Sequence, residues 1–250
     1  MYIKQTYSTS TLLREQYTDA LEHLYTIRTE YQTAGRGQAG NSWESEAGKN
    51  LLFSALLRYD GLLAIKQWRL SMLVAVALWE TLAKYLPKEK LTIKWPNDIY
   101  WGDKKLVGIL IENSLSGKYV GYSIVGIGVN VNQTKWLSNA PNPISMLQIT
   151  GEEYDAEMLM NEWICAMKSW ELRSTEEIKA TYLQHLYRRE GWHTYVEREV
   201  STAPTAIAQQ GVEGAFLAQF IGITEQGELI LRKENNEENI YHFKQIRFVL

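Results

Sequence analysis

A glycine-rich stretch with one arginine is the first part of the sequence whose residue types could do chemistry. Residues 33–54 read TAGRGQAGNSWESEAGKNLLFS, so three closely spaced glycines surround Arg36. Glycine lets a backbone turn sharply and approach a ligand closely because it has no Cβ. Arginine binds a carboxylate or a phosphate through two parallel hydrogen bonds. The loop therefore predicts an anion-binding site, although a hairpin loop with one solvated arginine would have the same composition.

Two familiar phosphate-binding motifs fit this stretch poorly. Gly35, Gly37 and Gly40 match the pattern G-x-G-x-x-G, but in a dinucleotide-binding fold the third glycine opens a helix. Here that glycine precedes Asn-Ser-Trp and then a strand-like apolar run. The tripeptide GKN at residues 48–50 resembles the end of a P-loop, but asparagine stands where that motif needs serine or threonine. We therefore reject both motifs.

Three further segments carry charged or polar residues at defined places. Residues 94–98 read KWPND, residues 105–112 read KLVGILIE and residues 126–130 read GIGVN. Lys105 is a second fixed cation, and Asp98 offers the hard oxygen ligand that Mg²⁺ binds together with phosphates. Each segment alone has a structural interpretation, as a rigid turn or a solvated strand end. The order and spacing of all four segments together are more specific.

Composition narrows the class of protein. The chain has 250 residues, of which 45% are hydrophobic and 22% are charged, as in ordinary globular proteins. The net charge of −3 gives no basic field, so we expect no DNA partner. Without a secretory signal or an 18-residue apolar run, we expect a cytoplasmic protein with no membrane partner. The four histidines lack the spacing of a zinc site, and Cys165, the only cysteine, is predicted to be a buried thiol in a helix.

The elements that must position these motifs are predicted from periodicity and turn residues. We expect helices at 11–21, 66–86, 155–172 and 174–189, and strands at 24–31, 51–58, 99–101, 105–112 and 119–132. Asp155 predicts a helix N-cap, and Ser174 with Glu177 predicts a capping box. Gly102 and Asp103 predict a hairpin turn.

The sequence changes character at Gly191. After it only short strand-like pieces occur, which predicts a small all-β, barrel-like module over 191–250 behind a first domain over 1–190. Because helices and hairpins are mixed rather than strictly alternating, the fold class is predicted as α+β with a mixed or antiparallel sheet.

Together, the four motifs resemble the catalytic domain of biotin–protein ligases, which belong to the biotin/lipoate ligase family. The resemblance covers roughly residues 1–190, and the rest resembles the small SH3-like β-barrel of these enzymes. It implies a class II synthetase-like mixed sheet. It also implies an enzyme that activates biotin with ATP as biotinyl-5′-AMP and transfers it to a lysine of a biotin carboxyl carrier protein or domain.

The resemblance further implies Mg²⁺ as a cofactor, with ATP and biotin as substrates, and a monomer or homodimer. Some relatives carry an N-terminal DNA-binding domain. The first motif here begins at Ser8, so we expect no such domain.

Roles for single residues follow from the same resemblance. The catalytic set would be Lys105, Arg36 and Asp98, and the metal would be held by Asp98 and Asn130. The biotin-binding set would be Ser8, Thr9, Ser10, Gln32, Gly35, Arg36, Gly37, Gln38, Lys105 and Gly108. The ATP- and adenylate-binding set would be Arg36, Gly37, Gln38, Asn41, Trp43, Asn97, Lys105 and Asn130.

Three positions depart from the pattern of the family. Ser10 stands where many relatives have asparagine, which puts one hydrogen bond to the ureido group of biotin in question. Gln38 stands where many bacterial relatives have a second arginine, and Asn41 replaces a basic residue. Both changes put charged contacts with the adenylate in question.

Two alternatives stay open besides a biotin ligase. A lipoate–protein ligase would share the fold and the adenylation chemistry, but KWPND followed by KLVGILIE favours biotin. A non-catalytic binding protein of the same fold is disfavoured by the presence of Arg36, Asp98 and Lys105 together. Joining a carboxylate to an anionic triphosphate needs fixed cations, and Arg36 and Lys105 are suitable ones.

Overall fold

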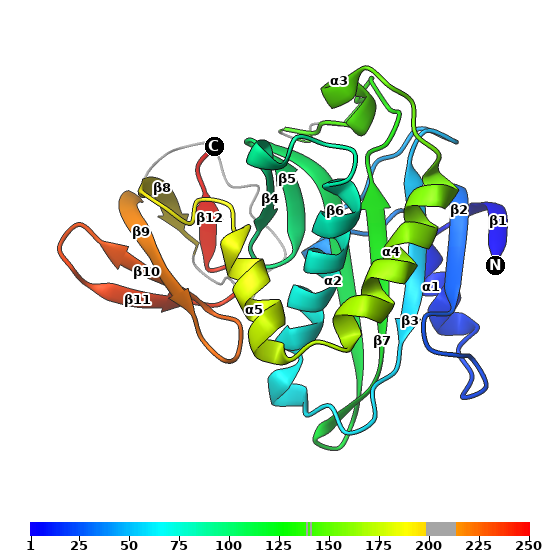
Figure 1. The fold of residues 1–250 in the computed structure, drawn as a ribbon, viewed down its shortest axis with the longest axis horizontal. Coiled ribbons are helices and arrows are strands. Elements are labelled where there is room, and N and C mark those ends of the chain that lie inside the picture. The colour runs from blue at the N-terminus through cyan, green and yellow to red at the C-terminus, as the bar shows by residue number, and fades with distance from the viewer. Residues whose placement is uncertain (139, 141, 199–213) are drawn as a thin grey trace. The chain divides into compact units, whose positions relative to one another are not determined.

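The protein is described by a computed structural model that covers residues 1–138, 140, 142–198 and 214–250. The chain separates into two compact units, Met1–His185 and Leu186–Leu250. Each unit is built on its own sheet (Figure 1).

The first unit contains a seven-stranded mixed sheet. The strand order is β1-β2-β3-β7-β6-β5-β4, in which β1 and β2 are parallel and all other neighbours are antiparallel. The strands are β1 (Tyr2–Thr6), β2 (Thr26–Gln32), β3 (Leu51–Leu57), β4 (Leu91–Lys94), β5 (Asp98–Trp101), β6 (Lys104–Ser116) and β7 (Tyr119–Val129). The predicted hairpin at Gly102 joins β5 to β6, and the mixed sheet with helices confirms the α+β prediction.

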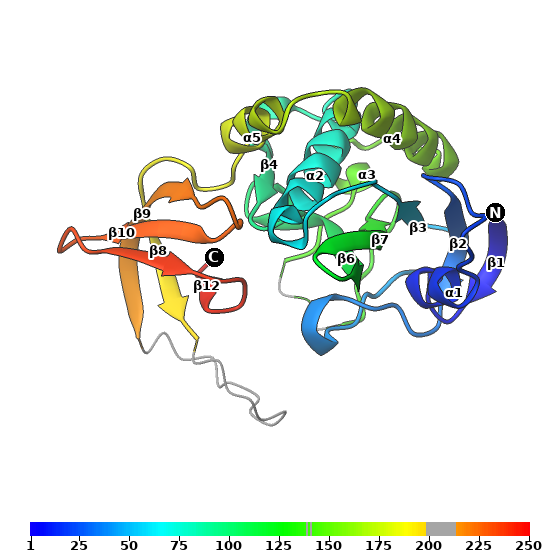
Figure 2. The ribbon, with the colours of Figure 1, turned by 90° about the horizontal axis from the view of Figure 1, so that it is seen from below.

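Helices cover both faces of this sheet. They are α1 (Thr9–Glu15), α2 (Trp68–Leu82), α3 (Met146–Thr150), α4 (Ala156–Glu171) and α5 (Thr175–Gln184), with short 3₁₀ turns at Gln38–Gly40, Ala64–Lys66 and Lys88–Lys90. Figure 2 shows α2, α4 and α5 on one side of the strands and α1 on the other. Every residue of β3 is buried as a result, which fits its sequence LLFSALL, apolar except for Ser54.

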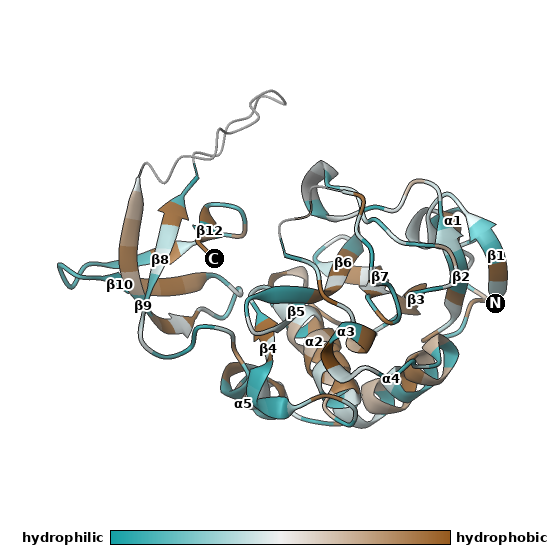
Figure 3. Cartoon of the chain, turned by 90° about the horizontal axis from the view of Figure 1, so that it is seen from above, coloured by the Kyte–Doolittle hydropathy of each residue, from teal (hydrophilic) through white to brown (hydrophobic). Residues whose placement is uncertain are grey.

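The long helices follow their sequence signals. The predicted apolar stripe of α2 is in the core, with Trp68, Met72 and Val76 at most 8% exposed. The Asp155 carboxylate accepts hydrogen bonds from two backbone N–H groups of the first turn of α4, and the predicted capping box of α5 is present. Figure 3 shows the contrast between the largely hydrophobic α2 and the largely hydrophilic α5.

The second unit is an antiparallel sheet in its described part. The order is β11-β10-β9-β8-β12, with β8 (Trp192–Glu197), β9 (Ala215–Ile223), β10 (Leu229–Lys233), β11 (Glu238–Tyr241) and β12 (Ile246–Phe248). The Arg188 guanidinium links the first strand of this unit to its C-terminal residues, because it donates to the carbonyls of Thr194 and Val249. No helix among the described residues is long and apolar enough to cross a membrane.

Three predictions about helices were wrong. The first helix covers Thr9–Glu15 rather than 11–21, and the helix expected to reach residue 189 ends at Gln184. Cys165 is exposed rather than buried. It lies two residues from the fully buried Trp163, which places it about 200° around the helix, on the opposite face.

Candidate active site

Three glycines form a flat floor on the sheet face that carries α1. Gly108 on β6 is paired with Gly128 on β7, and Gly126 lies two residues earlier on β7, so all three share one face. A Cβ on Gly128 or Gly108 would lie 2.4 or 2.5 Å from the indole of Trp43. A Cβ on Gly126 would lie 2.4 Å from Ser10 Oγ. Glycine is therefore needed here because side chains from two other segments rest directly on the strands.

The first turn of α1 supplies a cluster of hydroxyl groups at one side of this floor. The Thr9 backbone N–H and Oγ1 both donate to Gln32 Oε1, at 2.8 and 3.1 Å. Ser54 Oγ on β3 lies 2.8 Å from Thr9 Oγ1 and 2.9 Å from Ser10 Oγ. Thr9, Ser10 and Ser54 are at most 5% exposed. The cluster is a small polar area surrounded by apolar core, suited to the polar edge of a small ligand.

The glycine loop folds back on itself beside the floor. The Gly37 N–H donates to the Asn41 carbonyl at 2.7 Å, and the Trp43 N–H donates to the Gly35 carbonyl at 2.9 Å. Because of this close return, a Cβ on Gly35 would lie 2.5 Å from the Trp43 carbonyl oxygen. Gly35 therefore allows the close backbone approach that was expected of it, and the fold of the loop places Trp43 on the glycine floor.

Lys105 and Asp98 form an ion pair at the start of β6. Lys105 Nζ lies 2.6 Å from Asp98 Oδ2, and both side chains keep contact with solvent, at 32% and 22% exposure. The backbone of Lys105 is fixed by hydrogen bonds with Asn142 and Ile144. The cation is thus held by a strand on one side and by a carboxylate on the other.

Gln38 joins the glycine loop to the KWPND segment. Its Nε2 donates to Asn97 Oδ1 at 3.3 Å and to the Ile109 carbonyl at 3.2 Å. Asn97 is only 3% exposed. The Gln38 amide therefore links the glycine loop to the KWPND segment and to β6.

Arg36 is drawn toward α1 and the far part of β6. Its two terminal nitrogens contact the two oxygens of Glu112 at 3.2 and 2.6 Å, and Nη1 also donates to Thr11 at 3.3 Å. This fork-to-fork pair is the geometry in which arginine binds carboxylates. Arg36 therefore already binds a carboxylate in the described structure, and that carboxylate belongs to the protein.

Asn130 offers an unused acceptor at the end of β7. Its Nδ2 donates to the carbonyls of Lys105 and Ile144, whereas its buried Oδ1 has no hydrogen-bond partner among the described residues. Asp98 and Asn130 both contact Lys105 and both present oxygen, the ligand type that Mg²⁺ prefers. The described residues contain no group of three or more His, Cys, Asp or Glu able to hold a metal. The Asp98 carboxylate and the unused Asn130 Oδ1 are oxygen ligands of the type that Mg²⁺ binds together with phosphates and water.

Tyr182 on α5 supports the KWPND segment from the core. Its hydroxyl donates to the Pro96 carbonyl at 2.9 Å, and the side chain is fully buried. Burial and the nearby Asp98 carboxylate raise the pKa of Tyr182 well above its ordinary value, so the hydroxyl keeps its proton and remains a donor.

Tyr182→Phe should lower the free energy of unfolding by about 1 kcal/mol, because it removes one buried hydrogen bond. Urea unfolding checks this, with Tyr17→Phe as the matched control. The Tyr17 hydroxyl bonds to Asp19 at the surface, where water can replace it. Equal losses in the two variants would show that Tyr182 does not support Pro96.

Most of the predicted site residues lie around the glycine floor. Thr9, Ser10, Gln32, Gly35, Gln38, Trp43, Asn97, Asp98, Lys105, Gly108 and Asn130 are joined by the contacts above. Ser8 makes no side-chain cap hydrogen bond, and Asn41 is exposed. Sequence reasoning missed Ser54 and Glu112, because each is a single polar residue within a mainly apolar strand segment and carries no local sign of a role in the site. The G-x-G spacing of β7 was the available signal for the floor.

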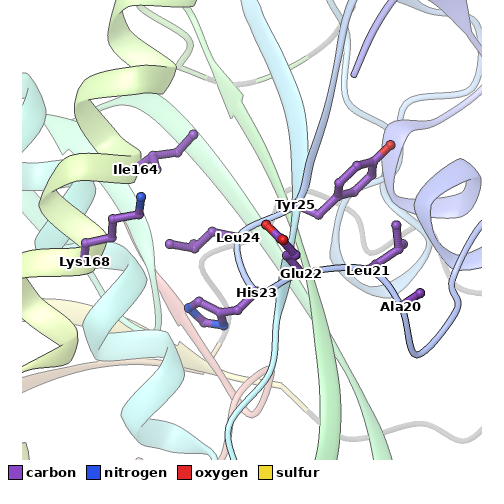
Figure 4. A pocket seen from close by; sticks show the side chains of 8 residues that line it. All are labelled: Ala20, Leu21, Glu22, His23, Leu24, Tyr25, Ile164 and Lys168. Atoms are coloured by element: carbon purple, nitrogen blue, oxygen red, sulfur yellow. The ribbon is translucent and has the colours of Figure 1, made fainter.

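A separate hollow is unrelated to these residues. A pocket of about 420 Å³ lies between the segment that leads into β2 and helix α4 (Figure 4). Its lining includes His23, Tyr25 and Lys168 and contains none of the predicted site residues. We therefore place the candidate active site at the glycine floor rather than at this pocket.

Comparison with known proteins gives this arrangement a context. Residues 2–130 match the model of the biotin/lipoate A/B protein ligase family. The chain is 33% identical to the biotin–[acetyl-CoA-carboxylase] ligase of Paracoccus denitrificans over 80% of this chain and 81% of that protein. It is 31% identical to the bifunctional ligase/repressor BirA of Bacillus spizizenii over 84% of this chain. It spans only 62% of that repressor and 60% of BirA from Escherichia coli.

Solved structures agree at the level of the fold. The biotin protein ligase of Aquifex aeolicus in complex with biotin and ATP aligns with a TM-score of 0.73 and 23% identity, over 100% of this chain and 98% of that one. The biotin protein ligase of Leishmania major in complex with biotinyl-5-AMP aligns with a TM-score of 0.65 and 18% identity, over 96% of this chain and 97% of that one. The family match covers more than half of the chain and the Paracoccus relative matches over most of its length, so this chain belongs to the biotin/lipoate A/B protein ligase family.

Proposed function

We propose that this chain is an ATP-dependent biotin–protein ligase. It forms biotinyl-5′-AMP and transfers the biotinyl group to a lysine of a biotin carboxyl carrier protein or domain. The observation that carries the proposal is the gathering of the buried hydroxyl cluster, Trp43 and Lys105 around one glycine floor. The identity with the Paracoccus ligase supports it. The first unit acts as the catalytic domain, and the second is the small SH3-like domain of the family.

The hydroxyl cluster favours biotin over lipoate. Biotin is an apolar bicycle with a polar ureido edge, whereas the dithiolane ring of lipoate has no comparable donors and acceptors. Thr9, Ser10 and Ser54 with Gln32 would pair with the ureido edge. These groups already bond to one another, and a ligand without that edge would leave their remaining donors and acceptors unused, so a site of this kind should reject such analogues.

The two cations serve the adenylation step. An oxygen of the biotin carboxylate attacks the α-phosphorus of ATP, the bond to the β-phosphate oxygen breaks, and pyrophosphate leaves with the electron pair. Arg36 binds the carboxylate, and Lys105 stabilises the charge that develops on the α-phosphate. Lys105 is held at the start of β6, whereas Arg36 must exchange the Glu112 carboxylate for that of biotin before the reaction.

Asp98 and Asn130 would hold Mg²⁺ together with phosphate oxygens, and the ion would supply further charge neutralisation when bound. In the described structure Asp98 instead neutralises Lys105. This pair holds the lysine beside Gly108 on the floor.

The transfer step depends mainly on position. The neutral amine of the carrier lysine attacks the acyl carbon of the mixed anhydride, the bond to the phosphate oxygen breaks, AMP leaves with the electron pair and the nitrogen gives up one proton. The mixed anhydride is already activated, so holding the two reactants together accounts for most of the acceleration. The Gln38 contact with Asn97 helps to keep the loop over the adenylate until the carrier lysine binds.

Biotin-dependent exchange of label between pyrophosphate and ATP tests the proposal. The full chain is incubated with MgATP, labelled pyrophosphate and biotin, lipoate or no acid. We expect exchange with biotin and background exchange in the other two reactions. Exchange with lipoate equal to that with biotin would contradict the assignment, as would no exchange at all.

A further inference from the structure

Glu112 is the one carboxylate that contacts Arg36 among the described residues, and Arg36 is not its only partner. Arg36 Nη2 lies 2.6 Å from Glu112 Oε1, and Arg14 Nη2 lies 2.7 Å from the same oxygen. Arg14 belongs to α1, Arg36 to the glycine loop and Glu112 to β6, so the three charges come from three separate segments. The Glu112 side chain is only 21% exposed, whereas both arginines are about 40% exposed.

In this arrangement the Glu112 carboxylate would compete with a substrate carboxylate for Arg36. Both terminal nitrogens of Arg36 are directed to Glu112, and that edge of the guanidinium binds one carboxylate at a time. A substrate carboxylate that uses this edge must displace Glu112. Glu112 would then be left as a partly buried anion, which is costly unless another cation stays beside it.

Arg14 is the cation that could remain beside Glu112 after Arg36 has moved to a substrate carboxylate. It contacts Glu112 Oε1, and it belongs to helix α1, which packs against the sheet, rather than to the glycine loop. Partial burial alone would raise the pKa of Glu112, but the hydrogen bonds from Arg14 and Arg36 outweigh it and lower that pKa. Glu112 therefore remains ionised at neutral pH and available to pair with either arginine.

We propose that Glu112 is a positioning residue that pairs with Arg36 and gives it up to the carboxylate of the substrate, while Arg14 keeps Glu112 neutralised after the exchange. The inference rests on the proposed function, because it takes biotin as the incoming carboxylate. The affinity for this carboxylate then depends also on Glu112 and Arg14, which do not touch the substrate.

The proposal requires opposite effects from the two partners of the pair. Glu112→Gln removes the competing charge, so biotin should bind about two- to fivefold more tightly, the range expected for exposed ion pairs. Arg14→Gln leaves Glu112 dependent on Arg36, so biotin should bind about two- to fivefold more weakly. In the double variant, Arg14→Gln should have no further effect, because its partner charge is gone.

Calorimetric titration of the full chain with biotin and with biotinol, in which an alcohol replaces the carboxylate, tests this. We expect the opposite shifts with biotin and unchanged binding of biotinol. Glu157→Gln is the matched control, because Glu157 pairs with Arg28 at 2.8 Å on the surface. This variant should bind both ligands like wild type. Thermal melts of each variant establish that it is folded.

The outcomes separate the two proposals. If wild type binds neither biotin nor biotinol, the proposed function fails. If wild type binds biotin but the two variants shift biotin in the same direction, or shift biotin and biotinol alike, only the role of Glu112 is overturned. Opposite shifts confined to biotin would support it, since a purely structural role would affect both ligands.

Discussion

Lys105→Ala should reduce the rate of adenylate formation by about 10²–10³-fold, the loss typical of removing one preorganised donor to a developing charge. Biotin binding should fall only modestly, because the hydroxyl cluster and Arg36 remain in place. The lysine is held at the start of β6 and is paired with Asp98 at 2.6 Å.

The pyrophosphate-exchange rate and the dissociation constant of biotin are measured separately. Together they check whether the variant loses adenylation rate while it largely keeps biotin binding. Lys104→Ala is the matched control, because it removes the neighbouring lysine of the same strand, which is exposed and points to the other face. Lys104→Ala should behave like wild type. Wild-type exchange by Lys105→Ala would remove Lys105 from the adenylation step.

Gly35→Ala should weaken biotin binding by between about five- and a hundredfold. The new Cβ would meet the Trp43 carbonyl oxygen at 2.5 Å and Gln32 Nε2 at 3.2 Å. Backbone cannot yield as a flexible side chain can, and overpacking of this kind costs about 1–3 kcal/mol. The loop must open, which displaces Gln32 from Thr9 and moves Trp43 from the glycine floor.

Gly121→Ala in β7 provides the comparison. A Cβ at that position would make only an ordinary contact with the Ser114 carbonyl oxygen, at 3.5 Å. Titration with biotin and urea unfolding of both variants should show a defect in Gly35→Ala alone. Similar biotin affinity in the two variants would mean that the close return of the loop is not needed for the site.

The sequence predicted the elements whose signals are local. The Asp155 cap, the Ser174 capping box and the Gly102 turn each depend on residues within a few positions, and each is present. The strands with a long apolar run, such as β3 and β7, were also predicted at nearly the observed positions. In these segments local preference and tertiary packing favour the same structure.

The missed elements depend on partners far away in the sequence. β1 has the mixed sequence YIKQT and becomes a strand because it pairs with β2, more than twenty residues later. The first helix begins at Thr9 rather than at residue 11, so Thr9 and Ser10 lie in its first turn. Their hydroxyls bond to Gln32 and Ser54, which lie on two other strands.

The candidate site shows the same division. The motifs located Arg36, Asp98 and Lys105 by type and spacing. Their pairing could not be predicted, since Asp98 with Lys105 and Arg36 with Glu112 depend on the register of β5 and β6 and on the return of the glycine loop. Spacing along a chain indicates which residues could meet, and only the fold decides which charges neutralise one another.

The most direct test of the central claim is the mass of a carrier. The full chain is incubated with MgATP, biotin and an isolated biotin carboxyl carrier domain, and the carrier is analysed by intact-mass spectrometry. The account predicts that the carrier gains one biotinyl group, that its lysine→arginine variant gains none, and that lipoate does not replace biotin. A carrier that stays unmodified, although a known biotin ligase labels it under the same conditions, would contradict the account.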